Sequence, residues 1–151
     1  MANLREIVQL GDPILRQRAA IVRRFDDNLH KLLDDMANTM IEANGVGLAA
    51  PQIGISKRIA VIRTEDSVIE LINPVLTNGE GEEVDEERCL SVPDKGGLVK
   101  RYTQITINAK NRHGDDVEIK AEEYMARVFQ HEMDHLDGRL FIDIMTEEIT
   151  D

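Results

Sequence analysis

Gln130-His131-Glu132-Met133-Asp134-His135-Leu136 is the stretch that decides how this chain folds, because it places two histidines four residues apart with a glutamate after the first. Positions i and i+4 of a helix share one face, so both imidazoles can reach a single metal ion. Glu132 emerges at the edge of that face, where its carboxylate can take a proton from water without binding the metal. The pattern therefore predicts a helix that carries a metal site and a base beside it.

The size and composition are those of one globular domain. With 151 residues and 42% hydrophobic content, the chain is long enough to bury a core, and we expect a single domain over residues 1–151. A formal net charge of −11, without a basic block, disfavours a nucleic-acid partner. There is no signal-peptide core and no apolar run near the roughly 20 residues that span a bilayer, so we expect a cytoplasmic monomer with no membrane partner.

Hydrophobic spacing predicts the elements of the N-terminal part. Residues 6–10 read as a short strand, and Pro13 can start a short helix. Asp26 or Asp27 caps a longer amphipathic helix, which Asn44-Gly45 ends because both residues tolerate positive φ. The apolar residues of this helix recur every three or four positions: Leu29, Leu32, Leu33, Met36 and Met40.

The rest of the chain reads as antiparallel strands followed by the motif helix. Apolar and alternating runs predict strands at 58–62, 68–76 and 99–109, and a hairpin returns the last of these through 117–120. Pro74 has no amide donor and indicates an edge or a strand end. The motif helix is expected to begin near Glu122 and to stop at Gly138.

A glycine-punctuated apolar segment, Gly45-Val46-Gly47-Leu48-Ala49-Ala50-Pro51-Gln52-Ile53-Gly54, follows the first long helix. A tight loop is the simplest interpretation, because GxG occurs in many loops. Gln52 argues for more than a loop. An amide in apolar surroundings needs hydrogen-bond partners, and its NH₂ group beside a metal site suits a developing oxyanion.

A catalytic metal site needs a third protein ligand, for which the candidates are Cys89, Asp134 and His113. Cys89 is the best of them, because a thiolate binds borderline divalent metals well, although a lone cysteine is most often a small core residue. Asp134 lies about 100° around the helix from His135, so we expect it to contact the surroundings of the site. His113 falls in the predicted hairpin turn and is expected to face solvent.

Other residues are predicted to border the site. Residues 82–87 form an acidic run that we expect at the surface, with a structural role only for Glu87, two residues before the cysteine. Tyr124, Arg127 and Val128 fall on the same side of the motif helix as the histidines. These three side chains should therefore wall the cavity beside the metal.

Three separated stretches together resemble, in order and spacing, the three motifs of peptide deformylases. They are residues 45–52, the stretch Cys89-Leu90-Ser91 preceded by Glu87, and residues 130–136. The resemblance covers nearly the whole chain. It implies an α+β fold in which antiparallel sheets pack around a central helix that carries the HExxH motif, to which the hydrophobic spacing adds the second amphipathic helix near the N-terminus.

The resemblance also implies an activity, namely hydrolysis of the formyl group of N-terminal formyl-methionine in nascent polypeptides, with release of formate. Carried over to this chain, it implies that Cys89, His131 and His135 bind one divalent ion. Glu132 would be general base and then general acid. The ion would be Fe²⁺, with Zn²⁺, Ni²⁺ or Co²⁺ as alternatives, and the nascent chain would bring the protein into transient association with the ribosome.

The same resemblance assigns the residues that would hold the substrate. The side chain of Gln52 and the backbone N–H of Leu90 would donate hydrogen bonds to the oxyanion. The expected substrate-binding residues come from the glycine-punctuated segment and the motif helix: Gly45, Val46, Gly47, Tyr124, Arg127 and Val128.

Two residues depart from the family pattern. Arg88 stands where glycine usually precedes the cysteine, which makes the backbone less free and places a cation at the mouth of the site. Arg127 stands where an apolar residue is common, and we expect its aliphatic stem to face the substrate with the charge directed outward.

Two other functions fit the same helix. One is a deformylase-like protein that binds the metal with weak or altered activity, in which Arg88 and Arg127 block the site or recruit another ligand. The other is a general metallopeptidase, which would leave Gln52 and the Cys89-Leu90-Ser91 stretch without a role. Formate release from a formyl-methionyl peptide separates these hypotheses.

Overall fold

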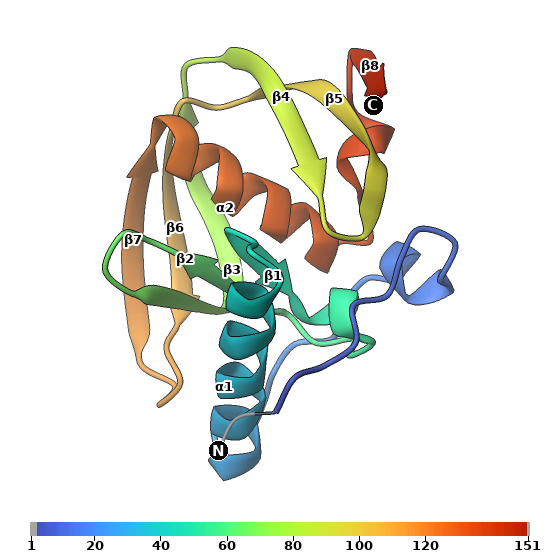
Figure 1. Cartoon of the computed structure of the whole chain (residues 1–151). Helices are drawn as coiled ribbons and strands as arrows, with labels where there is room; N and C mark the ends of the chain where they lie inside the picture. Colours follow the sequence, from blue (N-terminus) through green and yellow to red (C-terminus); the bar gives the residue numbers. More distant parts are fainter. Residues whose placement is uncertain (1–2, 151) are drawn as a thin grey trace.

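The computed structural model describes residues 3–150 and contains two antiparallel sheets and two α-helices. The larger sheet has the strand order β1 (Gly47–Ala49), β2 (Ile59–Arg63), β3 (Val68–Glu80), β6 (Gln104–Lys110) and β7 (Asp116–Glu122). The smaller sheet has the order β4 (Glu83–Cys89), β5 (Val92–Arg101) and β8 (Glu147–Thr150). Helix α2 (Glu123–Leu136) contacts strands of both sheets, and Figure 1 shows it running between them. The expected α+β fold, with antiparallel sheets and two helices, is confirmed.

The two helices cover opposite faces of the larger sheet. On β2, Ala60 and Ile62 point into the cluster that contains residues of α2, whereas Ile59 and Val61 point into the cluster formed with α1 (Asp27–Glu42). All four side chains are fully buried. A strand covered on both faces has no polar side, which explains the unbroken apolar run at this place in the sequence.

Helix α1 and the hairpin lie where the sequence predicts them, although the hairpin strands have other bounds, Gln104–Lys110 for β6 and Asp116–Glu122 for β7. Asp26 caps α1, with its carboxylate accepting a hydrogen bond from the N–H of Leu29 at 3.1 Å. A 3₁₀ turn, η1 (Pro13–Arg16), begins at the predicted proline. Strand β7 returns antiparallel to β6, and Gly138 follows the end of α2 with φ of 75°. Among residues 3–150, no helix is both long enough and apolar enough to cross a membrane.

The predicted strand over residues 99–109 is wrong, because the chain changes sheets within it. Strand β5 ends at Arg101 and β6 begins at Gln104. The alternation of buried and exposed residues continues across the break, so the sequence pattern does not reveal it. Gln130 of α2 holds the break: its Oε1 accepts from the N–H of Tyr102 at 3.0 Å and its Nε2 donates to the Tyr102 carbonyl at 2.9 Å.

Pro74 lies within β3 but beyond Ile72, where the pairing with β2 ends, so it occupies a local edge of the strand as expected. A register shift with β6 between Ile72 and Val75 accommodates the absent N–H. Two further interpretations are corrected. The segment after α1 is β1 followed by a 3₁₀ turn, η2 (Ala50–Ile53), and is not simply a loop. Residues 6–10 form no strand, because their amides bond to two separate segments: Val8 to the Gln52 carbonyl and Leu10 to the Ser91 carbonyl, both at 2.8 Å.

A buried carboxylate fixes the start of the chain to α1. Asp35 is fully buried and accepts hydrogen bonds from the N–H of Asn3 at 2.7 Å and from Arg5 at 2.9 and 3.1 Å. Burial alone would raise the pKa of Asp35, but the hydrogen bonds from Asn3 and Arg5 outweigh it and hold the pKa below 3.8. The folded state therefore binds a proton at this group less readily than the unfolded chain.

We expect Asp35→Asn to lower the free energy of unfolding by about 2 kcal/mol at neutral pH, because charge-assisted hydrogen bonds to Asn3 and Arg5 are lost. The contribution of a carboxylate with a depressed pKa is fully present above its unfolded pKa and is lost as pH falls through the folded value. The deficit of the variant should thus be constant above pH 4 and shrink below it. Urea denaturation at a series of pH values measures this, with Asp66→Asn in the exposed turn as the charge-matched control.

Candidate metal centre

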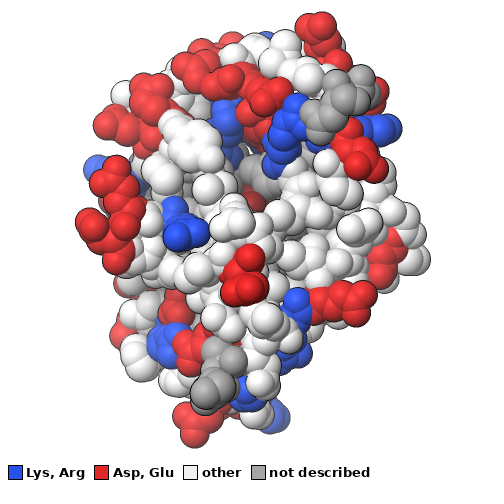
Figure 2. Space-filling model, in the orientation of Figure 1, with Lys and Arg blue, Asp and Glu red and all other residues white. Residues whose placement is uncertain are grey.

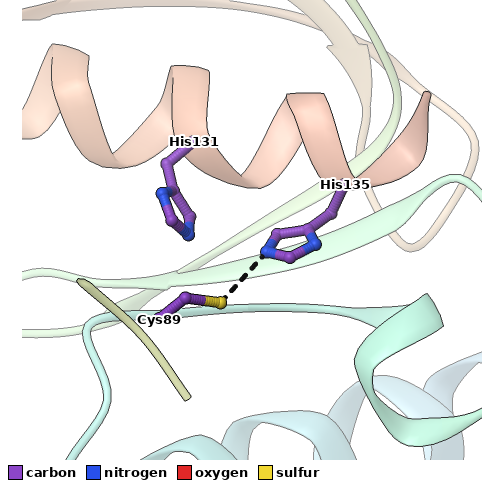
Figure 3. A group of neighbouring side chains, drawn as sticks. All are labelled: Cys89, His131 and His135. Atoms are coloured by element: carbon purple, nitrogen blue, oxygen red, sulfur yellow. Dashed lines mark hydrogen bonds between the residues drawn. The ribbon is translucent and has the colours of Figure 1, made fainter. Parts of the chain in front are cut away.

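Three potential ligands from two elements converge at the centre of the molecule. Helix α2 presents His131 and His135 one turn apart, and Cys89 comes from the end of β4. The Sγ atom of Cys89 and a ring nitrogen of each histidine all lie within 4.8 Å of one another, and Sγ is 3.4 Å from His135 Nε2 (Figure 3). The register of β4 with β5 shifts between Arg88 and Cys89, which turns the thiol toward the helix.

The donor set fits a divalent metal ion. One thiolate and two imidazoles suit borderline metals, and three protein ligands leave a further position open. Beside them, Glu132 Oε1 and His135 Nδ1 are buried without a hydrogen-bond partner among the described residues. A buried unpaired carboxylate oxygen is costly, and it indicates a position where water or substrate completes the site.

The other two candidate ligands lie away from this group. Asp134 Oδ2 accepts a hydrogen bond from Arg101 Nη1 at 2.6 Å, so it contacts the surroundings of the site as expected. His113 is exposed in the β6–β7 turn and stacks edge-on with His30 at 5.4 Å between ring centroids. Within residues 3–150, Cys89 is therefore the third ligand that the geometry offers.

Glu87 supports His131 from behind. Its Oε1 accepts from His131 Nδ1 at 2.8 Å and from Arg101 Nη2 at 2.9 Å, and its Oε2 accepts from Arg101 Nε at 2.8 Å and Arg127 Nη1 at 2.7 Å. Burial would raise the pKa of Glu87, but Arg101 and His131 lower it to about 2. A carboxylate that stays ionised fixes the proton on Nδ1, which leaves Nε2 of His131 for the metal.

The outward charge expected for Arg127 is wrong. Its side chain is only 6% exposed, and the guanidinium points into the protein, where it also donates to the carbonyls of Val99 at 2.8 Å and Glu83 at 2.9 Å. The buried charge of Glu87 attracts it, since a lone buried carboxylate costs several kcal/mol. Arg127 thus ties β4 and β5 to α2, and it also borders the cavity.

Glu132 lies on the cavity side of α2, and the pKa of its carboxyl is raised. Burial raises the pKa of its carboxyl to about 7. A pKa near neutrality suits a group that takes up a proton and gives it back. A methyl group added at Gly47 would lie 2.5 Å from Glu132 Oε2, so this close approach requires glycine at position 47.

Gln52 holds its amide in one orientation beside the ligands. Oε1 accepts from the N–H of Ala49 at 2.9 Å, and Nε2 donates to Ser91 Oγ at 3.2 Å and to Cys89 Sγ at 3.5 Å. The orientation is therefore set, with the NH₂ group toward the cysteine. Leu90, whose N–H follows the cysteine directly, lines the same cavity.

These residues surround a cavity of about 540 Å³ that opens to the surface. Figure 2 shows a hollow on this face, with Lys or Arg side chains at its rim and acidic atoms inside. Val46 and Tyr124 stand at the mouth with 43% and 59% of their surface exposed. All predicted site residues except His135 line this cavity, and His135 is buried. The lining residues that the sequence predicted are Gly45, Val46, Gly47, Gln52, Cys89, Leu90, Tyr124, Arg127, Val128, His131 and Glu132.

Sequence reasoning missed two residues of the site. Arg101 bridges Glu87 and Asp134. The sequence feature that could have indicated this role is that an arginine occupies an inward-facing position of an alternating strand. Ser91 is fully buried and accepts from Gln52, and its signal was its place in the Cys89-Leu90-Ser91 motif. Arg88 stands at the cavity mouth as expected, with its guanidinium over Gly96 and 3.4 Å from Glu86 Oε1.

Comparison with known proteins gives consistent results. The family model for polypeptide deformylases matches residues 4–150. A peptide deformylase of Pelotomaculum thermopropionicum is 51% identical over 138 residues, which cover 91% of this chain and 89% of that protein.

Solved structures agree in the same way. The peptide deformylase of Thermotoga maritima superposes with a TM-score of 0.93 at 43% identity, over 95% of this chain and 99% of that one. A class I type b peptide deformylase of Acinetobacter baumannii with Met-Ala-Ser bound gives a TM-score of 0.91 at 34% identity, over 96% and 100% of the two chains.

The role of Glu87 predicts that Glu87→Gln weakens metal binding by about 10–100-fold, because His131 and the buried Arg127 lose their anionic partner and Arg101 keeps only Asp134. Competition with a chelator measures the affinity. Glu86→Gln makes the same change at the adjacent residue, whose side chain is 46% exposed and accepts from Arg88, and should leave the affinity unchanged. Equal affinities for both variants would contradict the supporting role.

Proposed function

This chain belongs to the polypeptide deformylase family, and from this premise we propose how its own residues carry out the reaction. The family consists of metal-dependent enzymes that remove N-terminal formyl groups, and the chain is such a hydrolase. We assign Cys89, His131 and His135 as the metal ligands. The observation that supports this assignment most strongly is their convergence within 4.8 Å beside a buried carboxylate of raised pKa.

The chemistry then falls to groups around the cavity. A divalent ion held by the three ligands would polarise the formyl oxygen and lower the pKa of adjacent water. Glu132 takes a proton as water attacks the formyl carbon, and its pKa near 7 lets it return that proton to the nitrogen when the C–N bond breaks. Formate and the free amine are the products.

We propose two donors for the charge that develops on the formyl oxygen. The Nε2 of Gln52 is oriented by Ala49 and Ser91 and faces the thiol, and the N–H of Leu90 follows the cysteine in the chain. Donors held rigidly before the reaction stabilise an oxyanion without reorganising, and in many acyl-transfer enzymes this stabilisation contributes more to the rate than any other effect.

The substrate is proposed to enter along the mouth of the cavity. The relative solved with Met-Ala-Ser bound has the same fold and supports a methionine side chain in this cavity. Gly45, Val46 and Gly47 would form one wall, and Tyr124, Val128 and the stem of Arg127 the other. The half-exposed Val46 and Tyr124 offer apolar surface for a peptide.

We further propose Fe²⁺ as the ion in the cell, with Zn²⁺, Ni²⁺ or Co²⁺ able to replace it, because the Cys/His/His donor set accepts all four. Residues 1–151 would act as one catalytic domain, as a monomer in the cytoplasm. The substrate would be the formyl-methionyl end of nascent chains, so association with the ribosome would be transient. A net charge of −11 supports a brief encounter, since it opposes tight binding to RNA.

Glu132→Gln tests the proposed base. The variant should keep one metal ion per chain and lose about 10²–10⁴-fold in kcat for formate release from formyl-Met-Ala-Ser, because no group remains to accept the proton. Anaerobically prepared protein loaded with each of the four metals provides the samples. Glu118→Gln on exposed strand β7 is the matched control and should retain full activity. Failure of the wild-type protein to release formate with any metal would overturn the proposal.

A further inference from the structure

The two proposed oxyanion donors come from different parts of the fold. Gln52 lies in η2, which follows β1 of the larger sheet, whereas Leu90 follows β4 of the smaller sheet. No strand of one sheet pairs with a strand of the other within residues 3–150. A misplacement of about 1 Å at a reacting group can cost on the order of 100-fold in rate, so the spacing between these segments needs a separate support.

The N-terminal segment spans that gap. Figure 1 shows it leaving the side of α1 and passing η2 before it reaches η1. The amide of Val8 donates to the carbonyl of Gln52 itself, and the amide of Leu10 donates to the carbonyl of Ser91, both at 2.8 Å. Two residues of one segment therefore hold both sides of the oxyanion site by their backbone.

These contacts close a ring. Gln52 Nε2 donates to Ser91 Oγ at 3.2 Å, and the chain from Val8 to Leu10 joins the two carbonyl contacts on the other side. Each member of the ring restricts the others, because moving Ser91 away from Gln52 would break a contact to the N-terminal segment as well. The side chain of Leu10 is 43% exposed, so its amide contributes more to this ring than its apolar surface.

The far end of the segment is anchored independently. Arg5 and Asn3 bond to the buried Asp35 of α1, and the N–H of Arg5 donates to Thr39 Oγ1 at 2.9 Å. Ile7 packs against the same hydrophobic cluster as Leu90. The segment is therefore under constraint at both ends, as a positioning element must be.

We propose that residues 3–10 form a strap that positions the oxyanion donors, with the amides of Val8 and Leu10 as its contact points. The strap touches neither substrate nor metal, and it acts through Gln52 and through Ser91 next to Leu90. This inference rests on the proposed role of Gln52 and Leu90 in the reaction. It assigns a kinetic role to backbone groups of a segment that has no other place in the site.

Leu10→Pro tests the strap with little disturbance. The N–H of Asp12 donates to the Gln9 carbonyl at 3.0 Å and Gly11 has φ of 109°, so Leu10 occupies the second position of a turn, where proline is favoured. The change therefore removes the amide donor and suits the local backbone. Leu10→Ala keeps the amide and is the matched control.

We expect Leu10→Pro to lower kcat for formyl-Met-Ala-Ser by about 10-fold. This loss is smaller than the roughly 10²–10³-fold decrease in kcat that follows complete removal of an oxyanion donor, because the donors are displaced and not removed. KM and the metal content should stay within about 2-fold of wild type, and Leu10→Ala should match wild type. In a Gln52→Ala background, Leu10→Pro should lower kcat by less than about 3-fold, because the Gln52 side chain no longer joins Ser91 to the other donor and only the Leu90 N–H can still be displaced.

The outcomes are distinguishable. Equal kcat for the proline and alanine variants, a loss that follows metal content, or the same 10-fold loss in both backgrounds would overturn the strap. Unchanged kcat in Gln52→Ala alone would instead overturn the proposed oxyanion role. If Leu10→Pro does not fold, the α-hydroxy acid analogue of leucine at position 10 removes the same N–H and gives the same comparison.

Discussion

The buried negative charge of Glu87 is the interaction on which the site depends. An unpaired carboxylate in this position would cost several kcal/mol, so it is stable only when Arg101 of β5 and Arg127 and His131 of α2 are all in place. Burial of Glu87 on β4 therefore requires both that β5 brings Arg101 into place and that α2 brings Arg127 and His131. The same requirement brings Cys89, two residues further along β4, opposite the two histidines.

The fold separates the tasks of the site between its layers. Helix α2 carries two ligands and the base, the smaller sheet brings the thiolate and the Leu90 amide, and the larger sheet leads into Gln52. The two sheets do not pair with each other in the described part of the chain. Side chains and one N-terminal segment therefore fix their relative position. Gln130 serves this purpose at the β5–β6 break, and Gln52 serves it at the cavity.

Local patterns predicted the local structure well. The cap at Asp26, the spacing of leucines in α1 and the HExxH helix follow rules that operate within a few residues. The three motifs predicted the family correctly, and they predicted most of the residues that line the cavity. What the sequence did not reveal depends on distant partners. The inward turn of Arg127 is decided by Glu87, 40 residues away, and the sheet change after Arg101 is hidden because the alternation continues through it.

X-ray absorption spectroscopy of the zinc-loaded protein gives the most direct test of the proposed metal centre, in which one thiolate and two imidazoles bind the ion on this framework. We expect one sulfur scatterer at about 2.3 Å and two imidazole nitrogens at about 2.0–2.1 Å, with the sulfur lost in Cys89→Ser. A shell without sulfur in the wild-type protein, or one with three imidazoles, would contradict this ligand set.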